Sequence, residues 1–505
     1  MYIIRTFAGR LCKPAFLLLV LGGLNSCGLG VDTASVFNPL AIPPLIDSRE
    51  HAAAINMYIQ EGEHEFYKGV KSKTLGFNGD YLGPTIRLYN GDDVNVRFYN
   101  QLKDATTVHG HGLHVPGSVD GGPQSRINPG EVWDITIPVR QEASTNWYHP
   151  HLMGKTAEHV HAGLAGMYIV EDKNSLSIDL PREYGVNDVP LVVQDRSFIN
   201  GKMKEYQIDG QAMMEGLRED TLVVNGTLDP EFSAKKGWLR LRILNGSNAR
   251  SYEFYLSSGA DFFKVATEGG FLDAPVALSS IVMGPGERNE ILVDLRQGDS
   301  VDLMARFLNV ERNAIWDNFT PSHRVLHINN TGAVGEFIGD LPKKMNSIEF
   351  YSKSDVSVVR SFELDMGMDG EGGMDGEGGM DGEGGMDDMN MEGMFHPFSI
   401  NGQTMKLNVI NERVEKGKLE LWRVNGDGMD HPFHMHGTSF QILSRNGSSP
   451  ELADQGWKDV VMVGEGWTEL LLKFEHEATD EFPYMYHCHI LEHEDGGMMG
   501  QFTVK

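Results

Sequence analysis

The sequence predicts an all-β protein made of three similar β-sandwiches. Its 505 residues, of which 40% are hydrophobic, exceed the usual size of one hydrophobic core and indicate two or three domains. Short segments rich in Val, Ile, Leu, Tyr and Thr recur between Gly, Asn, Asp and Pro, as is typical of strands and hairpins. One such cadence returns three times, so we expect three domains.

The repeated cadence is a strand-forming segment with turn residues beside it. Its first copy, residues 85–98, reads TIRLYNGDDVNVRF and predicts two strands joined by a hairpin turn. Residues 237–246 (GWLRLRILNG) and 417–426 (GKLELWRVNG) carry a related pattern. We infer that the chain builds one supersecondary unit three times.

The most chemically informative stretch is residues 486–498, which read YHCHILEHEDGGM and offer one thiol, three imidazoles and a thioether. Side chains alternate between the two faces of a strand, so His487 and His489 can share one face while Cys488 points to the other. The tripeptide can therefore serve two metal centres. A thiolate, two histidines and a weak axial methionine form the blue-copper ligand set. This stretch supplies three of those four members: Cys488, His493 and Met498.

Three more histidine groups complete the pattern. Residues 431–437 (HPFHMHG) hold three imidazoles, of which His431 is the natural fourth member of the blue-copper set. Residues 109–112 (HGHG) and 149–151 (HPH) contain H-x-H pairs, and each pair can project two imidazoles from one strand face. A lone histidine is usually a surface residue or a satisfied core residue, but four clusters indicate metal binding.

Zinc is the alternative metal, because it also accepts histidine and cysteine. A structural zinc site closes with four ligands and a catalytic zinc site typically uses three, whereas these groups hold ten histidines, one cysteine and one methionine. A thioether is a soft ligand that suits copper better than zinc. The donor count and the methionine therefore favour copper.

In their order and separation, the four groups resemble the copper signatures of the multicopper oxidases, across nearly the whole exported chain. The resemblance implies four copper ions as cofactors: one type 1, one type 2 and a type 3 pair. It assigns the type 1 ligands to His431, Cys488, His493 and Met498. It assigns the type 2 ligands to His109 and His434, and the type 3 ligands to His111, His149, His151, His436, His487 and His489. Gly110 stands where the family commonly has tryptophan, and we expect this to change packing only.

The resemblance also implies an architecture. Each sandwich is then a Greek-key, cupredoxin-like domain, spanning residues 51–178, 179–340 and 341–505 after an N-terminal linker at 27–50. The ligands lie in the first and last thirds of the chain, so those two domains must meet around the copper cluster while the middle domain acts as a spacer. Four histidines outside the signatures are expected to be structural or exposed: His159, His161, His323 and His327.

The N-terminus predicts export. Basic residues precede an apolar run at residues 15–24 that is too short to span a membrane, as in a signal peptide covering residues 1–26. Residues 24–27 (LNSC) resemble a bacterial lipobox, so we expect Cys27 to carry a lipid anchor in the periplasm or at the outer membrane. An ordinary signal peptide with an incidental cysteine is the alternative.

The formal net charge of −28 argues against nucleic acid as a partner, because such a surface attracts cations instead. Residues 365–394 contain MDGEGG repeats without Lys or Arg, which forbids a packed core and predicts an insertion in the third domain. A solvated acidic linker is the alternative. Methionine at every sixth residue favours copper capture, because exposed thioethers oxidise and pack against nothing.

The insertion also resembles the methionine-rich segment of the copper efflux oxidases, bacterial multicopper oxidases that oxidise Cu(I) in the cell envelope. Asp427 and Met429 lie just before His431, where that subgroup has a carboxylate and a thioether for the incoming Cu(I). Met366 and Glu371 are the candidates that complete this substrate site, with glutamate in place of the subgroup's aspartate.

The expected function is oxidation of Cu(I) to Cu(II), coupled to reduction of O2 to two waters, for copper tolerance. Thioethers select Cu(I), and carboxylates stabilise the charge left when an electron departs. By position in the family, Asp120 and Glu494 are the candidates for a proton relay. We expect a monomer.

Other functions remain open. A laccase-type oxidase would use phenols and another oxidase would use Fe(II), and the sequence excludes neither. A copper sequestration protein without turnover has no need of the Cys488 bridge between two centres. A copper-free scaffold that keeps only the fold loses ligands, and this chain has lost none.

Overall fold

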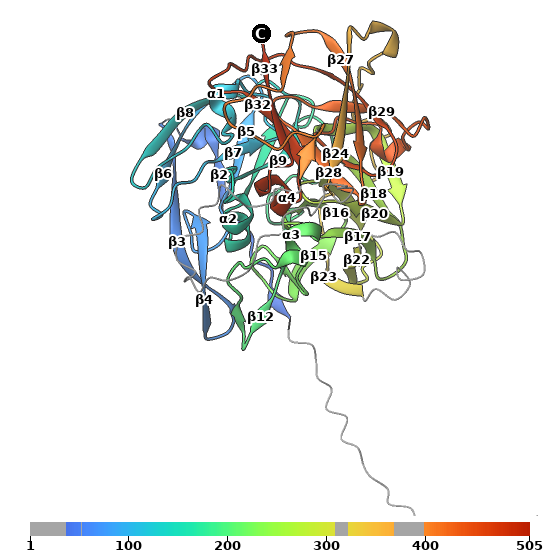
Figure 1. The fold of residues 1–505 in the computed structure, drawn as a ribbon. Helices are drawn as coiled ribbons and strands as arrows, with labels where there is room; N and C mark the ends of the chain where they lie inside the picture. The colour runs from blue at the N-terminus through green and yellow to red at the C-terminus, as the bar shows by residue number, and fades with distance from the viewer. Residues whose placement is uncertain (1–36, 52, 309–321, 368–397) are drawn as a thin grey trace, which may run out of the picture. The chain divides into compact units, whose positions relative to one another are not determined.

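The computed structural model describes residues 37–51, 53–308, 322–367 and 398–505. These residues form three sandwiches, each with two β-sheets around its own apolar core, which confirms the predicted all-β class (Figure 1). The predicted signal peptide, Cys27 and residues 368–394 of the predicted insertion lie outside the described residues.

The first sandwich is built from residues 45–171. One sheet runs in the order β4 (Val70–Phe77), β3 (Ile55–Tyr67), β6 (Asp93–Asn100) and β8 (Val132–Pro138). The other sheet runs in the order β2 (Leu45–Asp47), β5 (Thr85–Tyr89), β10 (Gly166–Glu171), β9 (Ser144–His149) and β7 (His109–His111). Apolar side chains from both sheets meet in one core, which includes Val96, Ile135 and Tyr168.

The second sandwich has two six-stranded sheets. One runs in the order β14 (Thr221–Val224), β11 (Asp188–Arg196), β16 (Trp238–Asn245), β21 (Arg288–Asp294), β18 (Phe262–Thr267) and β19 (Gly270–Leu278). The other runs in the order β1 (Asn38–Pro39), β15 (Pro230–Lys236), β23 (Ser322–Val334), β22 (Val301–Leu308), β17 (Ser251–Leu256) and β20 (Ser280–Met283). A separate hairpin joins β12 (Phe198–Ile199) to β13 (Lys202–Met203). Leu241, Phe254 and Ile291 lie in the core.

The third sandwich carries the C-terminus, drawn in orange to red in Figure 1. One sheet runs in the order β25 (Ser399–Ile400), β24 (Val358–Asp365), β27 (Leu419–Gly426), β31 (Thr468–Lys473) and β29 (Phe440–Arg445). The other runs in the order β26 (Glu412–Val414), β33 (Met499–Val504), β32 (Tyr484–Cys488), β28 (His431–Met435) and β30 (Val460–Val463). Trp422, Phe433 and Tyr486 lie in the core between them.

The three copies of the sequence cadence occupy equivalent places. β6, β16 and β27 each pair in parallel with an earlier strand and antiparallel with a later one. The predicted hairpin within residues 85–98 is wrong, because β5 and β6 belong to opposite sheets. The turn between them crosses the sandwich at Gly91, whose φ of 98° favours glycine.

Residues 38–47, within the predicted linker, form edge strands instead. β1 pairs in parallel with β15 of the second sandwich, and β2 pairs in parallel with β5 of the first. Asp47 then caps the 3-10 helix η1 (Ser48–Glu50) by accepting a hydrogen bond from the Arg49 N–H at 3.0 Å. These strands of two and three residues are too short for alternation to reveal them.

Short helices lie between the strands of the described residues: α1 (Gly117–Asp120), α2 (Thr156–Ala162), α3 (Gly210–Glu215), α4 (Leu491–Asp495), η3 (Lys353–Asp355) and η5 (Leu452–Asp454). α4, from the last third of the chain, lies at the N-terminus of α2 from the first third (Figure 1). The carboxylate of Asp495 accepts hydrogen bonds there from Thr156 N–H (3.1 Å) and Ala157 N–H (2.8 Å). No helix within these described ranges has the length and apolar character needed to cross a membrane.

Candidate metal centres

Four strands bring the histidine groups together. β7 pairs with β9, which sets His109 opposite His149. β28 pairs with β32, which sets His434 opposite His487. The other four histidines lie within two residues of the ends of these strands: His111, His151, His436 and His489.

These eight imidazoles form one buried cluster, in which every residue is at most 1% exposed. Their donor atoms fall into overlapping sets whose members lie within 4.8 Å of one another: His109 with His111 and His149, His109 with His434 and His436, and His151 with His436 and His487. The ring centroid of His489 lies 5.0 Å from that of His111 and 5.4 Å from that of His149. All eight histidines that we expect to hold type 2 and type 3 copper therefore lie together. We call them the histidine cluster.

The outer nitrogens of four rings are already occupied by hydrogen bonds to the main chain. The Nδ1–H of His109 donates to the Asp120 carbonyl oxygen (2.8 Å), and that of His434 donates to the Asp459 carbonyl oxygen (2.8 Å). In the same way, His149 donates to the Pro150 carbonyl (2.8 Å) and His487 to the Cys488 carbonyl (2.9 Å). Each bond fixes the tautomer and leaves the Nε2 lone pair free. Histidines that bind metals commonly use their second nitrogen in this way.

Several ring nitrogens of the histidine cluster lack protein partners. Nε2 of His109, Nε2 of His434 and both ring nitrogens of His489 are buried without a hydrogen bond to any described residue. Nε2 of His436 lies 3.3 Å from Nε2 of His487, although each ring donates its Nδ1 proton elsewhere. Burial lowers the pKa of His436 to about 4 and the pKa of His487 well below its usual value, so both rings are neutral at pH 7. Two facing lone pairs repel unless a cation lies between them, and imidazole donors suit copper.

A second centre, the sulfur centre, lies around Cys488. Its Sγ lies 3.5 Å from Nδ1 of His431 and 3.6 Å from Nδ1 of His493. The Nε2–H groups of these rings donate to the main-chain carbonyls of Asp427 (3.1 Å) and Met214 (3.0 Å), which leaves both Nδ1 atoms free. Burial raises the pKa of the Cys488 thiol, so its thiolate form needs a bound cation.

Met498 lies beside the sulfur centre. Its side chain is buried in the same core as Cys488. The Cys488 N–H donates to the Met498 carbonyl at 3.1 Å, and the Met498 N–H donates to the His493 carbonyl at 2.9 Å. In the chain, Cys488 stands between His487 and His489 of the histidine cluster, so one tripeptide joins the two centres.

Asp120 contacts the histidine cluster as a carboxylate. Its Oδ2 accepts a hydrogen bond from Nδ1–H of His436 at 2.7 Å. Burial disfavours the charge, but His436 and His109 outweigh burial and hold the pKa of Asp120 well below its usual range. Asp120 therefore orients an imidazole and keeps its negative charge.

Glu494 contacts the same cluster in the opposite protonation state. Its oxygens lie 3.2 Å from Nδ1 of His151 and 3.3 Å from Nδ1 of His487. Burial, followed by the neighbouring Asp495, raises the pKa of Glu494 well above its usual value and favours the protonated form. Of the two predicted relay residues, Glu494 is the one whose protonated form is favoured.

Asp459 and Arg288 also contact the cluster, and no sequence motif marks them. Oδ1 of Asp459 accepts from Nε2–H of His111 at 3.2 Å, which leaves Nδ1 of His111 to face the cluster. The two oxygens of Asp459 accept from Arg288 at 2.6 Å each. Arg288 belongs to β21 of the middle sandwich and also donates to Oδ1 of Asn146 at 3.0 Å. The expectation that the middle domain is only a spacer is therefore wrong.

Aromatic and apolar side chains pack around the rings. Trp147 stacks on His149 with ring centroids 4.0 Å apart. At Gly110, where the family commonly has tryptophan, an added Cβ would lie 2.9 Å from Cδ1 of Leu113. Leu113 occupies the space beside this glycine. Glycine in place of tryptophan therefore changes the packing here and removes no metal donor.

Three of the four residues predicted to bind Cu(I) lie beside the sulfur centre. Asp427 and Met429 belong to the loop that joins β27 to β28, and the Asp427 carbonyl accepts from His431. Met366 is buried, and its Sδ lies 3.8 Å from where a Cβ on Gly428 would stand. Met366 therefore reaches the loop that carries Asp427 and Met429.

The fourth residue, Glu371, lies outside the described residues. The same loop borders a surface cavity of about 570 Å³. Met429 and Met462 line it together with Asp430 and Glu465, so two thioethers and two carboxyl groups face this space. The cavity offers room for a substrate near the sulfur centre.

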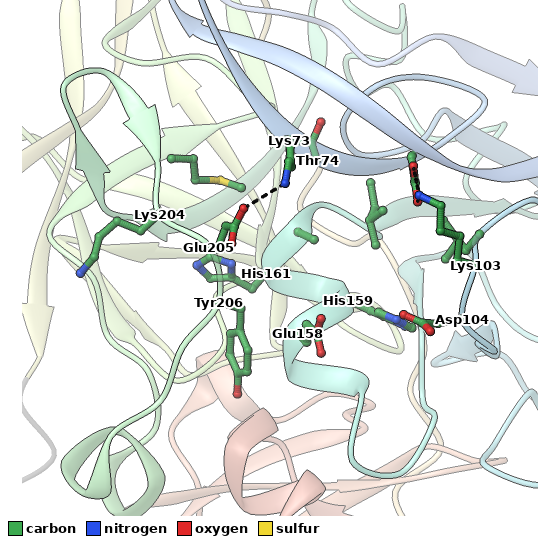
Figure 2. A pocket seen from close by; sticks show the side chains of 15 residues that line it. Lys73, Thr74, Lys103, Asp104, Glu158, His159, His161, Lys204, Glu205 and Tyr206 are labelled. Atoms are coloured by element: carbon green, nitrogen blue, oxygen red, sulfur yellow. Dashed lines mark hydrogen bonds and ion pairs between the residues drawn. The ribbon is translucent and has the colours of Figure 1, made fainter. Parts of the chain in front are cut away.

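A separate surface cavity, of about 330 Å³, opens beside α2 (Figure 2). Two of the residues that line it are His159 and His161. Nε2–H of His161 donates to Glu219 at 2.9 Å, and Nδ1 of His159 lies 3.2 Å from the Thr106 hydroxyl. Both histidines have structural partners, as the sequence predicts.

The two histidines of the middle domain also have structural partners. His323 stacks on Phe307, and His327 stacks on Phe37, with centroid separations of 4.0 Å and 4.4 Å. Nδ1–H of His327 donates to Asp302 at 2.6 Å. These contacts agree with the prediction that both are structural or exposed.

Comparison with known proteins gives related sequences along nearly the whole chain. Two family models, each described as multicopper oxidase, match residues 58–175 and 383–505, which contain all four histidine groups. Proteins named cell division protein FtsP are 35% identical. The one from Escherichia coli (strain K12) aligns over 481 residues and 94% of each chain, and the one from Yersinia pestis aligns over 491 residues and 95% of each chain.

Solved structures share the fold. A bacterial laccase-like multi-copper oxidase, CueO from Ochrobactrum sp., described with oxidase activity towards lignin model compounds and lignosulfonate, is 35% identical. It superposes with a TM-score of 0.82 and covers 92% of this chain and 100% of its own. A multicopper oxidase from Campylobacter jejuni, described as a metallo-oxidase, is 26% identical, with a TM-score of 0.77 over 93% of this chain and 95% of its own.

Proposed function

Because this chain belongs to the multicopper oxidase family, we propose that it oxidises Cu(I) to Cu(II) and passes the electrons to O2, which is reduced to two waters. One observation carries the proposal. Two buried sets of metal donors, the sulfur centre and the histidine cluster, are joined by His487, Cys488 and His489. Neither a storage protein nor a scaffold needs such a junction.

The donors fit four copper ions. Residues that would hold type 1 copper are His431, Cys488, His493 and Met498. Those that would hold type 2 copper are His109 and His434, and those that would hold the type 3 pair are His111, His149, His151, His436, His487 and His489. In these positions copper would supply one-electron redox chemistry, with electrons taken up at the sulfur centre and passed to O2 at the histidine cluster.

The loop with Asp427 and Met429 supports Cu(I) as the electron donor. Thioethers select the soft Cu(I) ion, and a carboxylate stabilises the charge that oxidation leaves behind. The hydrogen bond from His431 to the Asp427 carbonyl ties this loop directly to an expected type 1 ligand. Met366 borders the same loop and belongs to the proposed substrate site, for which Glu371 is the remaining candidate from the sequence.

Glu494 and Asp120 have different roles in this proposal. O2 reduction to water consumes protons, and a protonated carboxyl 3.2–3.3 Å from two imidazoles supports Glu494 as their donor. Asp120 supports the reaction differently, because its carboxylate keeps His436 in one tautomer.

The setting of the reaction is the bacterial cell envelope in this proposal. The basic and apolar pattern of residues 1–26 supports export, and the LNSC sequence supports a lipid anchor on Cys27. We further propose a monomer that needs no protein partner for turnover. Copper tolerance is the physiological role that follows from removing Cu(I) outside the cytoplasm.

The relatives named cell division protein FtsP favour a second candidate, a role in division without turnover. The donor sets argue against a purely structural role, because buried imidazoles without partners destabilise a protein that binds no metal.

Phenols are an alternative substrate, and the cavity of about 570 Å³ beside Met429 favours them.

Substitutions in the loop distinguish the substrates. We expect Met429→Leu to lower kcat/KM for Cu(I) about tenfold, because one favourable contact of about 1.4 kcal/mol is lost. A phenol has no use for the thioether, so its kcat/KM is expected to stay the same. Steady-state O2 consumption measures both values of kcat/KM.

Asp427→Asn is expected to weaken Cu(I) and Fe(II) oxidation together, because both reactions leave a more highly charged ion.

The matched control is Met345→Leu, which changes a buried methionine outside both centres. It is expected to leave every substrate unaffected. Equal losses for Cu(I) and the phenol in the Met429 variant would show that the loop only supports the fold.

Asp120→Asn tests the orientation of His436. We expect reoxidation of the reduced protein by O2 to slow about 10- to 100-fold, while reduction of the type 1 centre stays fast. Rapid mixing with Cu(I) and then with O2 separates the two steps. Asp134→Asn, at an exposed carboxylate of β8, is the control. Equal slowing of both steps would reject the assigned role.

A further inference from the structure

Four methionines form a cluster of their own beside the histidine cluster. Met405, Met485 and Met499 are at most 4% exposed and contact one another, and the half-buried Met153 packs against them. Every apolar side chain in this group is a methionine. We call it the methionine cluster.

Two of these methionines flank an expected copper ligand. Met485 and His487 are two residues apart in β32 and share one face of the sheet. Met499 of β33 lies directly opposite His487 in the register of the two strands. The carbonyl of Met485 also accepts a hydrogen bond from the His436 N–H at 2.9 Å.

The other two methionines come from loops outside β32 and β33, and one of them, Met153, is half-buried. Met153 follows His151 by two residues, and Nε2 of His151 lies 3.2 Å from Nε2 of His487. Met405 is held by a hydrogen bond from its N–H to the Gly497 carbonyl at 3.0 Å. The four methionines therefore extend from the half-buried Met153 to strand positions next to His487, and one of them bonds His436 through the main chain.

Packing alone does not account for this composition. Methionine fills irregular gaps in cores, but it normally mixes there with leucine, isoleucine and phenylalanine, as in the three sandwich cores. Four thioethers brought together form a soft donor set, which selects Cu(I) over Zn(II) or Cu(II).

We propose that the methionine cluster is a Cu(I)-binding site through which copper reaches the histidine cluster. The histidines are at most 1% exposed, so an ion that enters the folded protein must pass between side chains. Thioethers bind Cu(I) without a charge of their own and release it to imidazoles. This step moves an ion and changes no oxidation state. It rests on the proposed function only in taking copper as the ion of the histidine cluster.

Silver tests the site directly, because Ag(I) is a soft monovalent ion that does not change oxidation state here. The copper-loaded full-length protein is incubated with Ag(I), and bound silver is counted by native mass spectrometry. We expect the variant Met405→Leu/Met485→Leu/Met499→Leu to bind one silver ion fewer than the parent. Met345→Leu, which removes a buried thioether elsewhere, is expected to bind the same number as the parent. Equal counts for the triple variant and the parent would overturn the proposal.

The substitutions preserve volume, since exchanges between methionine and leucine usually cost less than about 1.5 kcal/mol each. If the triple variant fails to fold, Met153→Leu serves instead, because this side chain is only half-buried. We expect it to slow the uptake of Cu(I) by the copper-free protein about tenfold, measured anaerobically as protein-bound copper against time. An unchanged rate would contradict a role in loading. Neither readout requires turnover, so a protein that fails to oxidise Cu(I) still gives a result.

Discussion

Cys488→Ser is expected to abolish the visible absorbance of thiolate-bound copper and to lower O2 consumption at least about 100-fold with every substrate. Loss of an outer partner of a metal ligand already costs about 10- to 100-fold, and Cys488 is the only thiol of the sulfur centre. A serine hydroxyl supplies neither the soft donor nor the same connection to His487 and His489. Absorbance and oxygen-electrode measurements on one preparation give both results.

Copper content provides the control for this variant. We expect one copper ion to be lost and three to remain, because the substitution changes none of the eight histidines of the histidine cluster. Loss of all copper would point to misfolding. Sustained Cu(I)-driven O2 consumption would mean that electrons enter by a route other than the sulfur centre.

Arg288→Met is expected to cause the largest loss of stability, about 3–5 kcal/mol in the free energy of unfolding. Arg288 and Asp459 are both at most 1% exposed, and two hydrogen bonds of 2.6 Å join them. Methionine leaves the Asp459 carboxylate buried without its cation. Because Asp459 also binds His111, copper affinity should fall as well. Urea unfolding of copper-free and copper-loaded protein separates the two effects.

The control is Arg97→Met, which breaks a surface ion pair with Asp134 at the same type of contact. Exposed pairs contribute little, so its unfolding curve should stay close to that of the parent. If the two variants lose equal stability, the buried Arg288–Asp459 pair stabilises the protein no more than the surface pair does. The middle sandwich would then contribute less to the metal centres than its contacts indicate.

The pattern of side chains along the sequence predicts the longer strands of this fold. The repeated pattern gives the strands β6, β16 and β27, and it correctly predicts three similar sandwiches. Side-chain alternation does not say which sheet a strand joins, so it does not distinguish the turn at Gly91 from a hairpin turn. β1 and β2 have two and three residues and carry no period.

The expected metal donors were predictable because each comes from one of four short sequence motifs. The residues around them were not. Arg288 and Asp459 lie 171 positions apart and meet only because the middle sandwich packs against the third. Likewise, the methionine cluster draws Met153 and Met405 from distant loops. Contacts between domains leave no local pattern in a single sequence.

The most direct test of Cu(I) oxidation counts Cu(I) oxidised and O2 consumed in one vessel, using the fully copper-loaded protein. We expect four Cu(I) oxidised for each O2 and no accumulation of hydrogen peroxide, because two waters require four electrons. A protein that carries its full copper and consumes no O2 beyond the rate of free Cu(I) would contradict the proposed function.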